Sequence, residues 1–143
     1  MTDEIEIVVS MRAIGKGRPR FSKIGGLMRT YTPSQTRSAE KILAMAAKRV
    51  MVKRKMIGQG IPIRATIEAQ YEPPRSWSKK KREMALRLKS PKVGKPDCDN
   101  IEKLVFDSLN GIVFYDDSQL VSTSVRKFYG EIDSIRILIS EVK

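Results

Sequence analysis

The sequence predicts an α/β fold of the α+β type, with a mixed β-sheet backed by two main helices in one domain over residues 1–143. Apolar and polar residues alternate over residues 63–71, which is typical of a half-buried strand. Apolar residues recur at helical spacing over residues 39–50 and 101–109, which indicates two helices that each turn one face to a core. The order strand, helix, strand, helix, strand, strand favours a sheet of mixed direction. The length suits one core, and the sequence contains no internal repeat.

The N-terminal third is predicted to contain a strand, a basic loop and the first helix. Residues 5–9 form the strand, and residues 12–29 are basic, rich in glycine and free of acids, so we expect a loop or irregular hairpin that reaches into solvent. Thr32 as cap, Pro33 in the first helical position and Gln35 as partner in a capping box predict the helix start. The helix should end before Gly58 and Gly60, and its core-facing residues are expected to be Ala39, Ile42, Leu43, Ala46 and Val50.

The centre of the chain is predicted to hold a strand followed by a strongly basic segment. The strand runs from Ile63 to Tyr71, and Ser78 is placed to cap a short helix that ends near Lys89. Nine basic residues and one acid fall within residues 75–95. A charge run of this kind is either a solvated face or a phosphate-binding surface, and Trp77 either anchors it or stacks on a base.

The C-terminal part is predicted to form the second main helix and two strands. The helix spans about Asp99 to Asn110, with an apolar stripe and a glycine after its end. The strands cover residues 121–128 and 132–142, and the short connection at residues 129–131 favours an antiparallel hairpin. The expected apolar stripe consists of Ile101, Leu104, Val105 and Leu109.

The composition excludes several classes of protein. A formal net charge of +12 predicts attraction to phosphate backbones. It fits a catalyst that acts on such a backbone, but also a ribosomal protein or a binder of anionic surfaces. The absence of histidine excludes histidine-based nucleophile systems and histidine-bound metals, and the single cysteine, Cys98, excludes an internal disulfide and cysteine-based zinc sites. The glycines match no nucleotide-binding loop, so no nucleotide cofactor is expected. No apolar run is long enough for a membrane span and the N-terminus is acidic, so we expect a cytoplasmic protein without a membrane partner.

A cluster of acids in this basic chain is the candidate site. Asp97 and Asp99 lie two apart in a stretch expected to be extended, which would point both to one side. Lys103 follows Asp99 by one helical turn, and Asp116 and Asp117 come after the helix, where a short return would bring them near its start. Two carboxylates at about 4 Å would repel by on the order of 4 kcal/mol at an effective dielectric constant near 20. A converged cluster therefore needs a cation, and oxygen ligands suit Mg²⁺ or Mn²⁺.

The same acids also fit structural roles. Asp99 with Glu102 matches a helix capping box, and the pair Asp116 and Asp117 is typical of turns. Asp107, one turn beyond Lys103, is expected to hold that lysine in place. The residues alone therefore leave open a DNA-binding protein without catalysis.

The sequence resembles the RusA-type Holliday-junction resolvases over most of its length. The central motif is the most specific part, and it runs Lys95-Pro96-Asp97-Cys98-Asp99-Asn100-Ile101-Glu102-Lys103, then Phe106-Asp107-Ser108-Leu109-Asn110-Gly111, then Tyr115-Asp116-Asp117-Ser118-Gln119-Leu120. Segments similar to those of phage-borne members are Gly17-Arg18-Pro19-Arg20-Phe21, Tyr31-Thr32-Pro33 and Ser76-Trp77-Ser78-Lys79-Lys80. Cys98 stands where an aliphatic residue is usual, and Leu120 replaces a common valine.

The resemblance implies a homodimeric, Mg²⁺-dependent endonuclease that cuts four-way DNA junctions by paired symmetric nicks in recombination and repair, in a phage or prophage. The family's metal-binding aspartates are matched by Asp97, Asp99 and Asp117, and its catalytic lysine is matched by Lys103. The neighbouring Asp116 could share the role of Asp117, so the choice within this pair stays open. A nuclease for other branched DNA is a third possibility. Side chains expected to contact DNA phosphates are Arg18, Arg20, Lys79, Lys80, Lys81 and Arg82.

Overall fold

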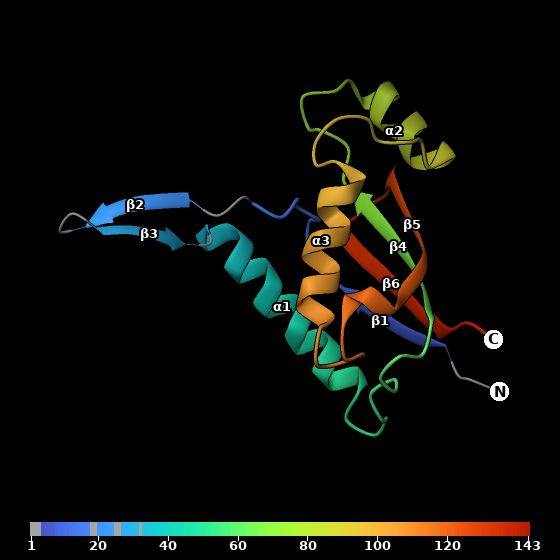
Figure 1. The fold of residues 1–143 in the computed structure, drawn as a ribbon. Coiled ribbons are helices and arrows are strands. Elements are labelled where there is room, and N and C mark those ends of the chain that lie inside the picture. Colours follow the sequence, from blue (N-terminus) through green and yellow to red (C-terminus); the bar gives the residue numbers. More distant parts are fainter. Residues whose placement is uncertain (1–3, 18–19, 25–26, 32) are drawn as a thin grey trace.

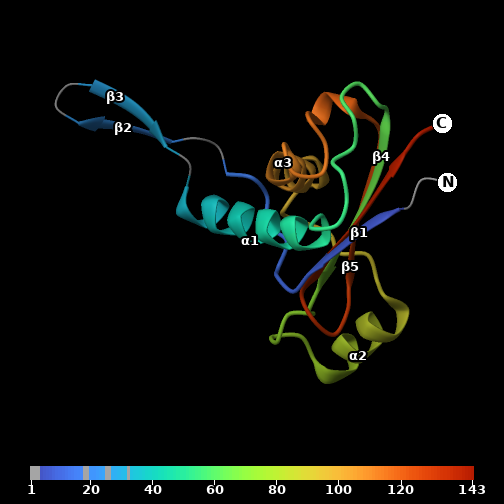
Figure 2. The ribbon, with the colours of Figure 1, turned by 90° about the horizontal axis from the view of Figure 1, so that it is seen from below.

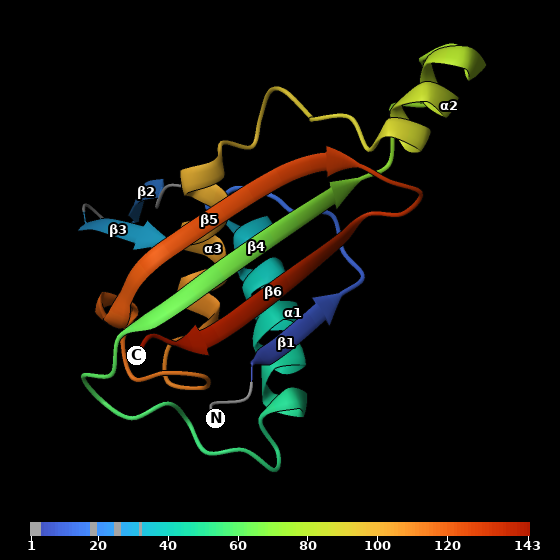
Figure 3. The ribbon, with the colours of Figure 1, turned by 90° about the vertical axis from the view of Figure 1, so that its right-hand side faces the viewer.

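The computed structural model describes residues 4–17, 20–24, 27–31 and 33–143 and has the predicted α+β architecture. Its main sheet has four strands: β1 (Ile5–Val9), β4 (Ile63–Tyr71), β5 (Leu120–Tyr129) and β6 (Ser134–Glu141). They lie in the order β1-β6-β4-β5 (Figure 3). β6 runs antiparallel to both β1 and β4, whereas β5 runs parallel to β4, so the sheet is mixed as expected.

Two helices cover one face of this sheet. α1 (Ser34–Val50) and α3 (Cys98–Leu109) pack side by side against it, and α2 (Lys79–Leu88) lies beyond one end of the strands (Figure 1). Ile67 and Ile137 from the sheet, Leu43 from α1 and Leu104 from α3 are fully buried in the core between these layers. Each such side chain contributes roughly 1.5–3 kcal/mol through burial. None of the helices in the described ranges is long and apolar enough to cross a membrane.

The opposite face of the sheet carries a network of charged side chains. Arg136 on β6 donates to Glu6 on β1 and to Glu68 on β4, at 2.7 and 3.0 Å, and Arg126 on β5 donates to Glu68 at 2.9 Å. These two carboxylates, Glu6 first, raise the pKa of Arg136. The network thus connects all four strands on the side away from α1 and α3, and it neutralises part of the positive charge there.

The basic N-terminal segment forms the predicted hairpin. β2 (Arg20–Ile24) and β3 (Leu27–Tyr31) pair antiparallel in a sheet of their own, from Arg20 opposite Tyr31 to Ile24 opposite Leu27. The hairpin extends away from the main sheet beyond the start of α1 (Figures 1 and 2).

The predicted hairpin between the last two strands is wrong. β5 and β6 lie on opposite sides of β4, so the connection between them crosses the end of β4 instead of forming a tight turn. The Gly130 N–H donates to the Tyr71 carbonyl at 2.9 Å during this crossing. A Cβ at Gly130 would lie 2.1 Å from Cδ of Gln70, so a larger residue there would have to displace the Gln70 side chain.

The start of α1 also differs from the prediction. The helix begins at Ser34, and Pro33 occupies the N-cap position without a side-chain capping bond. Thr32, the predicted cap, lies outside the described residues. Ala39 and Leu43 are buried as expected, but Ile42 is 46% exposed, because the buried face is centred on the row that also contains Ala47.

Candidate active site

The candidate acids begin at the N-terminus of α3. Asp97 is its N-cap residue, with φ −69° and ψ 150°, and Asp99 lies in the first turn. Both side chains are exposed. The backbone is extended at Asp97 as expected, but the extended stretch does not continue to Asp99, because the helix already begins at Cys98. The capping box of Asp99 with Glu102 is also absent from the helix start, since Asp97 takes the N-cap position.

Lys103 keeps the position that the sequence predicts for it. It lies four residues after Asp99 on α3, which places the two on the same flank of the helix, and it is exposed. Its side chain therefore leaves the helix on the flank that also carries Asp99.

Two lysines fix the loop that leads into Asp97. The Lys127 ammonium group, on β5, donates to the carbonyl oxygens of Gly94 and Pro96, the latter at 2.8 Å. Lys92 donates to the Lys95 carbonyl at 2.8 Å, and burial, with the charges of Lys127 and Arg12, lowers the pKa of Lys92. The position of Asp97 is thus set by β5 as well as by α3. Isolated lysines carry no sequence pattern, so these two were missed.

Asp116 and Asp117 lie at the other end of α3. The 12 residues of α3 span about 18 Å. The chain then turns through residues 110–116 and enters η1 (Asp117–Gln119), a short 3-10 helix near the C-terminal end of α3 (Figures 1 and 3). The predicted short return therefore does not bring Asp117 back to Asp97.

Asp116 has a structural role. Its carboxylate accepts a hydrogen bond from the Ser118 N–H at 3.1 Å and caps η1, and the bonds from Ser118 lower the pKa of Asp116. Buried Gln119 completes the capping box and donates to the Gly58 and Ile61 carbonyls at 2.8 and 3.0 Å. The structural role in a turn is therefore confirmed for Asp116. Asp117, the first residue of η1, is exposed.

One chain therefore does not gather the three predicted ligands. Within the described ranges, no three side chains of Asp, Glu or Cys form a group that could hold a metal ion. The carboxylates match the oxygen ligands that Mg²⁺ and Mn²⁺ prefer, but Asp97 and Asp99 are separated from Asp117 by the length of α3. The chemical nature of these side chains therefore fits Mg²⁺ or Mn²⁺, but their positions within one chain are too far apart to bind the same ion.

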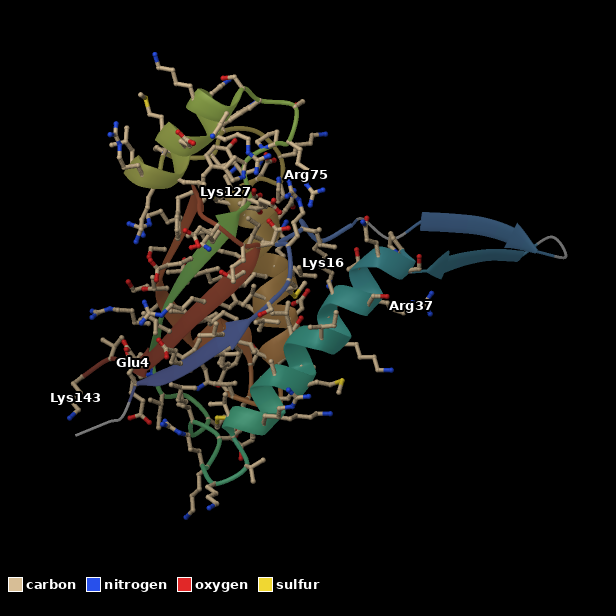
Figure 4. The ribbon with its side chains drawn as sticks, turned by 180° about the vertical axis from the view of Figure 1, so that it is seen from behind. Glu4, Lys16, Arg37, Arg75, Lys127 and Lys143 are labelled. Carbon is tan, nitrogen blue, oxygen red and sulfur yellow. The ribbon has the colours of Figure 1, made fainter. Side chains whose placement is uncertain are left out.

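Asp107 contacts a different lysine from the one expected. Lys16, in the segment after β1, forms an ion pair with Asp107 on α3, and its ammonium group also lies 3.9 Å from Glu40 on α1. Lys16 lies where residues 12–17 pass beside the two helices (Figure 4). Asp107 thus joins this segment to α3 instead of fixing Lys103.

Replacement of Lys16 by methionine is expected to destabilise the fold by about 1 kcal/mol or less, since the pair is partly exposed and therefore screened. The hydrogen bond to Asp107 raises the pKa of Lys16. The stabilisation is therefore complete below the ordinary value of 10.5 and is lost as the pH rises through the higher folded-state pKa. Urea unfolding of wild type and Lys16→Met should differ at pH 7, and the difference should shrink as the pH rises above 10.5. A difference that stays the same at high pH would contradict this assignment.

The predicted DNA-contacting residues fall into two groups. Lys79, Lys80 and Lys81 are exposed at the start of α2, where Ser78 caps the helix by accepting from the Lys81 N–H at 3.2 Å. Arg82 is less available, because it lies 3.7 Å from Glu72. Arg18 lies outside the described residues, and Arg20 is described only as the first residue of β2.

Trp77 anchors this basic segment. Its ring packs edge-on against Tyr129, with centroids 5.2 Å apart, and the Lys81 ammonium group lies 4.0 Å from its centroid. Of the two roles considered for Trp77, the structure supports the anchor.

Exposed carboxylates at both ends of one helix, in an α+β chain with a net charge of +12, define a candidate for phosphate chemistry on nucleic acids. The family described as Endodeoxyribonuclease RusA matches residues 10–140. The chain therefore belongs to the RusA endodeoxyribonuclease family, which confirms the resemblance and makes it a nuclease by class. It is also 32% identical over 142 residues to the uncharacterized protein YqaN of Bacillus subtilis (strain 168), and the match covers 98% of both chains.

Proposed function

We propose that this chain is a Mg²⁺-dependent endodeoxyribonuclease, with Mn²⁺ as an alternative metal, that resolves four-way DNA junctions by paired symmetric nicks. It acts as a homodimer of one endonuclease domain per chain, residues 1–143, in cytoplasmic recombination and repair of DNA, and a phage or prophage is its proposed origin. The observation that carries the proposal is the pair of exposed acidic groups at the two ends of α3, in a histidine-free basic chain that belongs to a family of endodeoxyribonucleases.

Asp97, Asp99 and Asp117 are the proposed metal ligands, and the homodimer reconciles them with their separation. A two-fold axis perpendicular to α3 and beside its middle places the C-terminal end of one helix next to the N-terminal end of the partner's helix. Asp117 of one protomer then completes the site that Asp97 and Asp99 begin on the other. Two equivalent sites on one dimer suit a reaction that cuts two symmetric strands.

The residues of each site then have distinct roles. A bound Mg²⁺ supplies polarisation of the scissile phosphate and a more acidic water molecule. Lys103, exposed one turn after Asp99, stabilises the negative charge that develops on the phosphate oxygens. Lys79, Lys80, Lys81 and Arg82, with Arg18 and Arg20 of the N-terminal segment, hold the DNA backbone without reading its sequence.

The test uses purified protein with end-labelled synthetic DNAs: a four-way junction, a three-way junction, a flap and a linear duplex of the same sequence. With Mg²⁺, the four-way junction should yield symmetric nicks near the branch and the linear duplex should stay intact. With EDTA, all four should stay intact. Tight binding without nicks in Mg²⁺ or Mn²⁺ would replace the enzyme with a DNA-binding protein, and preferential cutting of the flap or three-way junction would replace the substrate.

Replacement of Lys127 by methionine is expected to slow junction cleavage by about 10- to 100-fold, the usual range for residues that orient metal ligands. Lys127 holds the Gly94 and Pro96 carbonyls, so its loss frees the loop before Asp97. The cleavage rate should be measured at several Mg²⁺ concentrations, because a looser ligand should also raise the Mg²⁺ concentration required. Lys143→Met, which removes an equal charge from the exposed C-terminal residue, is the control. Equal rates for both variants would contradict the role of Lys127.

A further inference from the structure

A pocket of about 380 Å³ opens directly beside Asp97. It lies between the segment that follows β1, the first turn of α1 and the loop that enters α3. Its lining consists of residues 12–16, Gln35, residues 95–97 and Asn100. Neither the proposed metal site nor the DNA-contacting residues above include its basic side chains.

The wall of the pocket is fixed by buried contacts. Tyr71, fully buried at the end of β4, donates to the Ala13 carbonyl at 2.8 Å, and burial raises the pKa of Tyr71 to about 12. The Lys16 N–H donates to the Asn100 carbonyl at 3.1 Å. A Cβ at Gly15 would lie 3.0 Å from Cβ of Asn100, so the segment rests directly on the start of α3. The pocket is therefore a preformed feature of the fold.

The charges of the pocket favour an anion. Lys16 is occupied by Asp107 and Glu40. Lys95 is exposed, and Arg12 shares its charge with Asp133 but keeps about half of its side chain exposed. The Arg12 side chain is 54% exposed, lies 3.5 Å from Asp133 and is held over the Tyr71 ring at 5.0 Å. Lys95 is exposed, while its carbonyl is fixed by Lys92. Asp97 is the one acid among the lining residues.

We propose that this pocket binds a DNA backbone phosphate next to the scissile one, with Arg12 and Lys95 as its contacts. The inference rests on the proposed function, because it places the cut at Asp97. A guanidinium group is suited to two parallel hydrogen bonds with phosphate oxygens. A phosphodiester carries a single charge, so the repulsion from Asp97 is smaller than for a free phosphate dianion. Arg12 and Lys95 are positioning residues that set where along the backbone the nuclease cuts.

The test combines a protein change with removal of one phosphate charge. Junctions carry a single uncharged methylphosphonate at successive positions on either side of the branch, and binding is measured in EDTA. For wild type, a methylphosphonate at one position next to the mapped cut should weaken binding by about tenfold. Arg12→Gln and Lys95→Gln should bind the unmodified junction more weakly than wild type. In these variants the methylphosphonate at that position should cause little or no further loss of affinity. Each should also lower the slope of log affinity against log salt by about one.

Arg54→Gln is the matched control, because Arg54 is an exposed arginine after the far end of α1. In this variant the methylphosphonate should weaken binding by the same factor as in wild type. If the methylphosphonate weakens binding equally in wild type, Arg12→Gln and Lys95→Gln, the proposed phosphate subsite is wrong. Lys95 is exposed, so its variant keeps the test valid if Arg12→Gln fails to fold. The salt slope is also measured on linear duplex, where each variant should again lower it by about one. A failure of junction cleavage alone therefore counts against the proposed function, whereas unchanged methylphosphonate effects on the junction and unchanged salt slopes on both DNAs count against the subsite.

Discussion

Asp97→Asn is expected to bind a four-way junction as tightly as wild type and to cut it at least about 100-fold more slowly. Mutation of a residue that only orients a metal ligand typically lowers metal affinity or activity 10- to 100-fold. Mutation of a ligand itself should therefore lower the cleavage rate by at least about 100-fold. The side chain of Asp97 is exposed and makes no capping hydrogen bond in α3, so the change should alter the free energy of unfolding by less than about 0.5 kcal/mol. Single-turnover cleavage in Mg²⁺, with binding in EDTA, separates the two effects.

Asp116→Asn is the matched control for this prediction. Asp116 accepts its hydrogen bond from the Ser118 N–H, and an amide oxygen accepts the same bond. Its cleavage rate should therefore stay near that of wild type, in contrast to Asp97→Asn and Asp117→Asn. Loss of cleavage in Asp116→Asn with an intact Asp117→Asn would reverse the assignment within the pair.

Phe114→Ala is expected to destabilise the fold by about 3–5 kcal/mol. Phe114 is fully buried just before η1, and the Gly111 N–H donates to its carbonyl at 2.7 Å. A domain of this kind has a free energy of unfolding of roughly 5–15 kcal/mol, so a large part of its stability would be lost. Because Phe114 also supports the turn that presents Asp117, cleavage should fall at temperatures where the variant is still folded.

Urea unfolding monitored by circular dichroism measures this effect. Tyr115→Ala is the control, because the adjacent Tyr115 side chain is 52% exposed and its loss should cost less than about 1 kcal/mol. Similar midpoints for the two variants would show that Phe114 is not part of the core.

The elements that depend on local pattern could be predicted from the sequence. β4 and α3 have the periodicities of a half-buried strand and an amphipathic helix, and both form where expected. The pairing of strands could not be predicted, because β4 joins β5 in parallel through contacts between residues far apart in the chain. A short connection at Gly130 favoured a hairpin, but the energy of the whole sheet favours placing β4 between β5 and β6.

The candidate site shows the same division. The motif identified Asp97, Asp99, Lys103 and Asp117 as residues to consider, but sequence spacing did not indicate that α3 separates the first two from the last. Lys16 and Lys127 act on partners 91 and 31 residues away, and neither stands in a recognisable pattern. Long-range contacts of this type become visible only when the fold places the two residues together.

A subunit-mixing experiment tests the central claim, a site shared between two protomers, most directly. Asp97→Asn and Asp117→Asn are each expected to be inactive as homodimers. After the two are unfolded together and refolded, half of the dimers carry one intact shared site, so about a quarter of the wild-type site activity should return. These dimers should make single nicks instead of paired nicks. A mixture that is no more active than either variant alone would contradict a shared site.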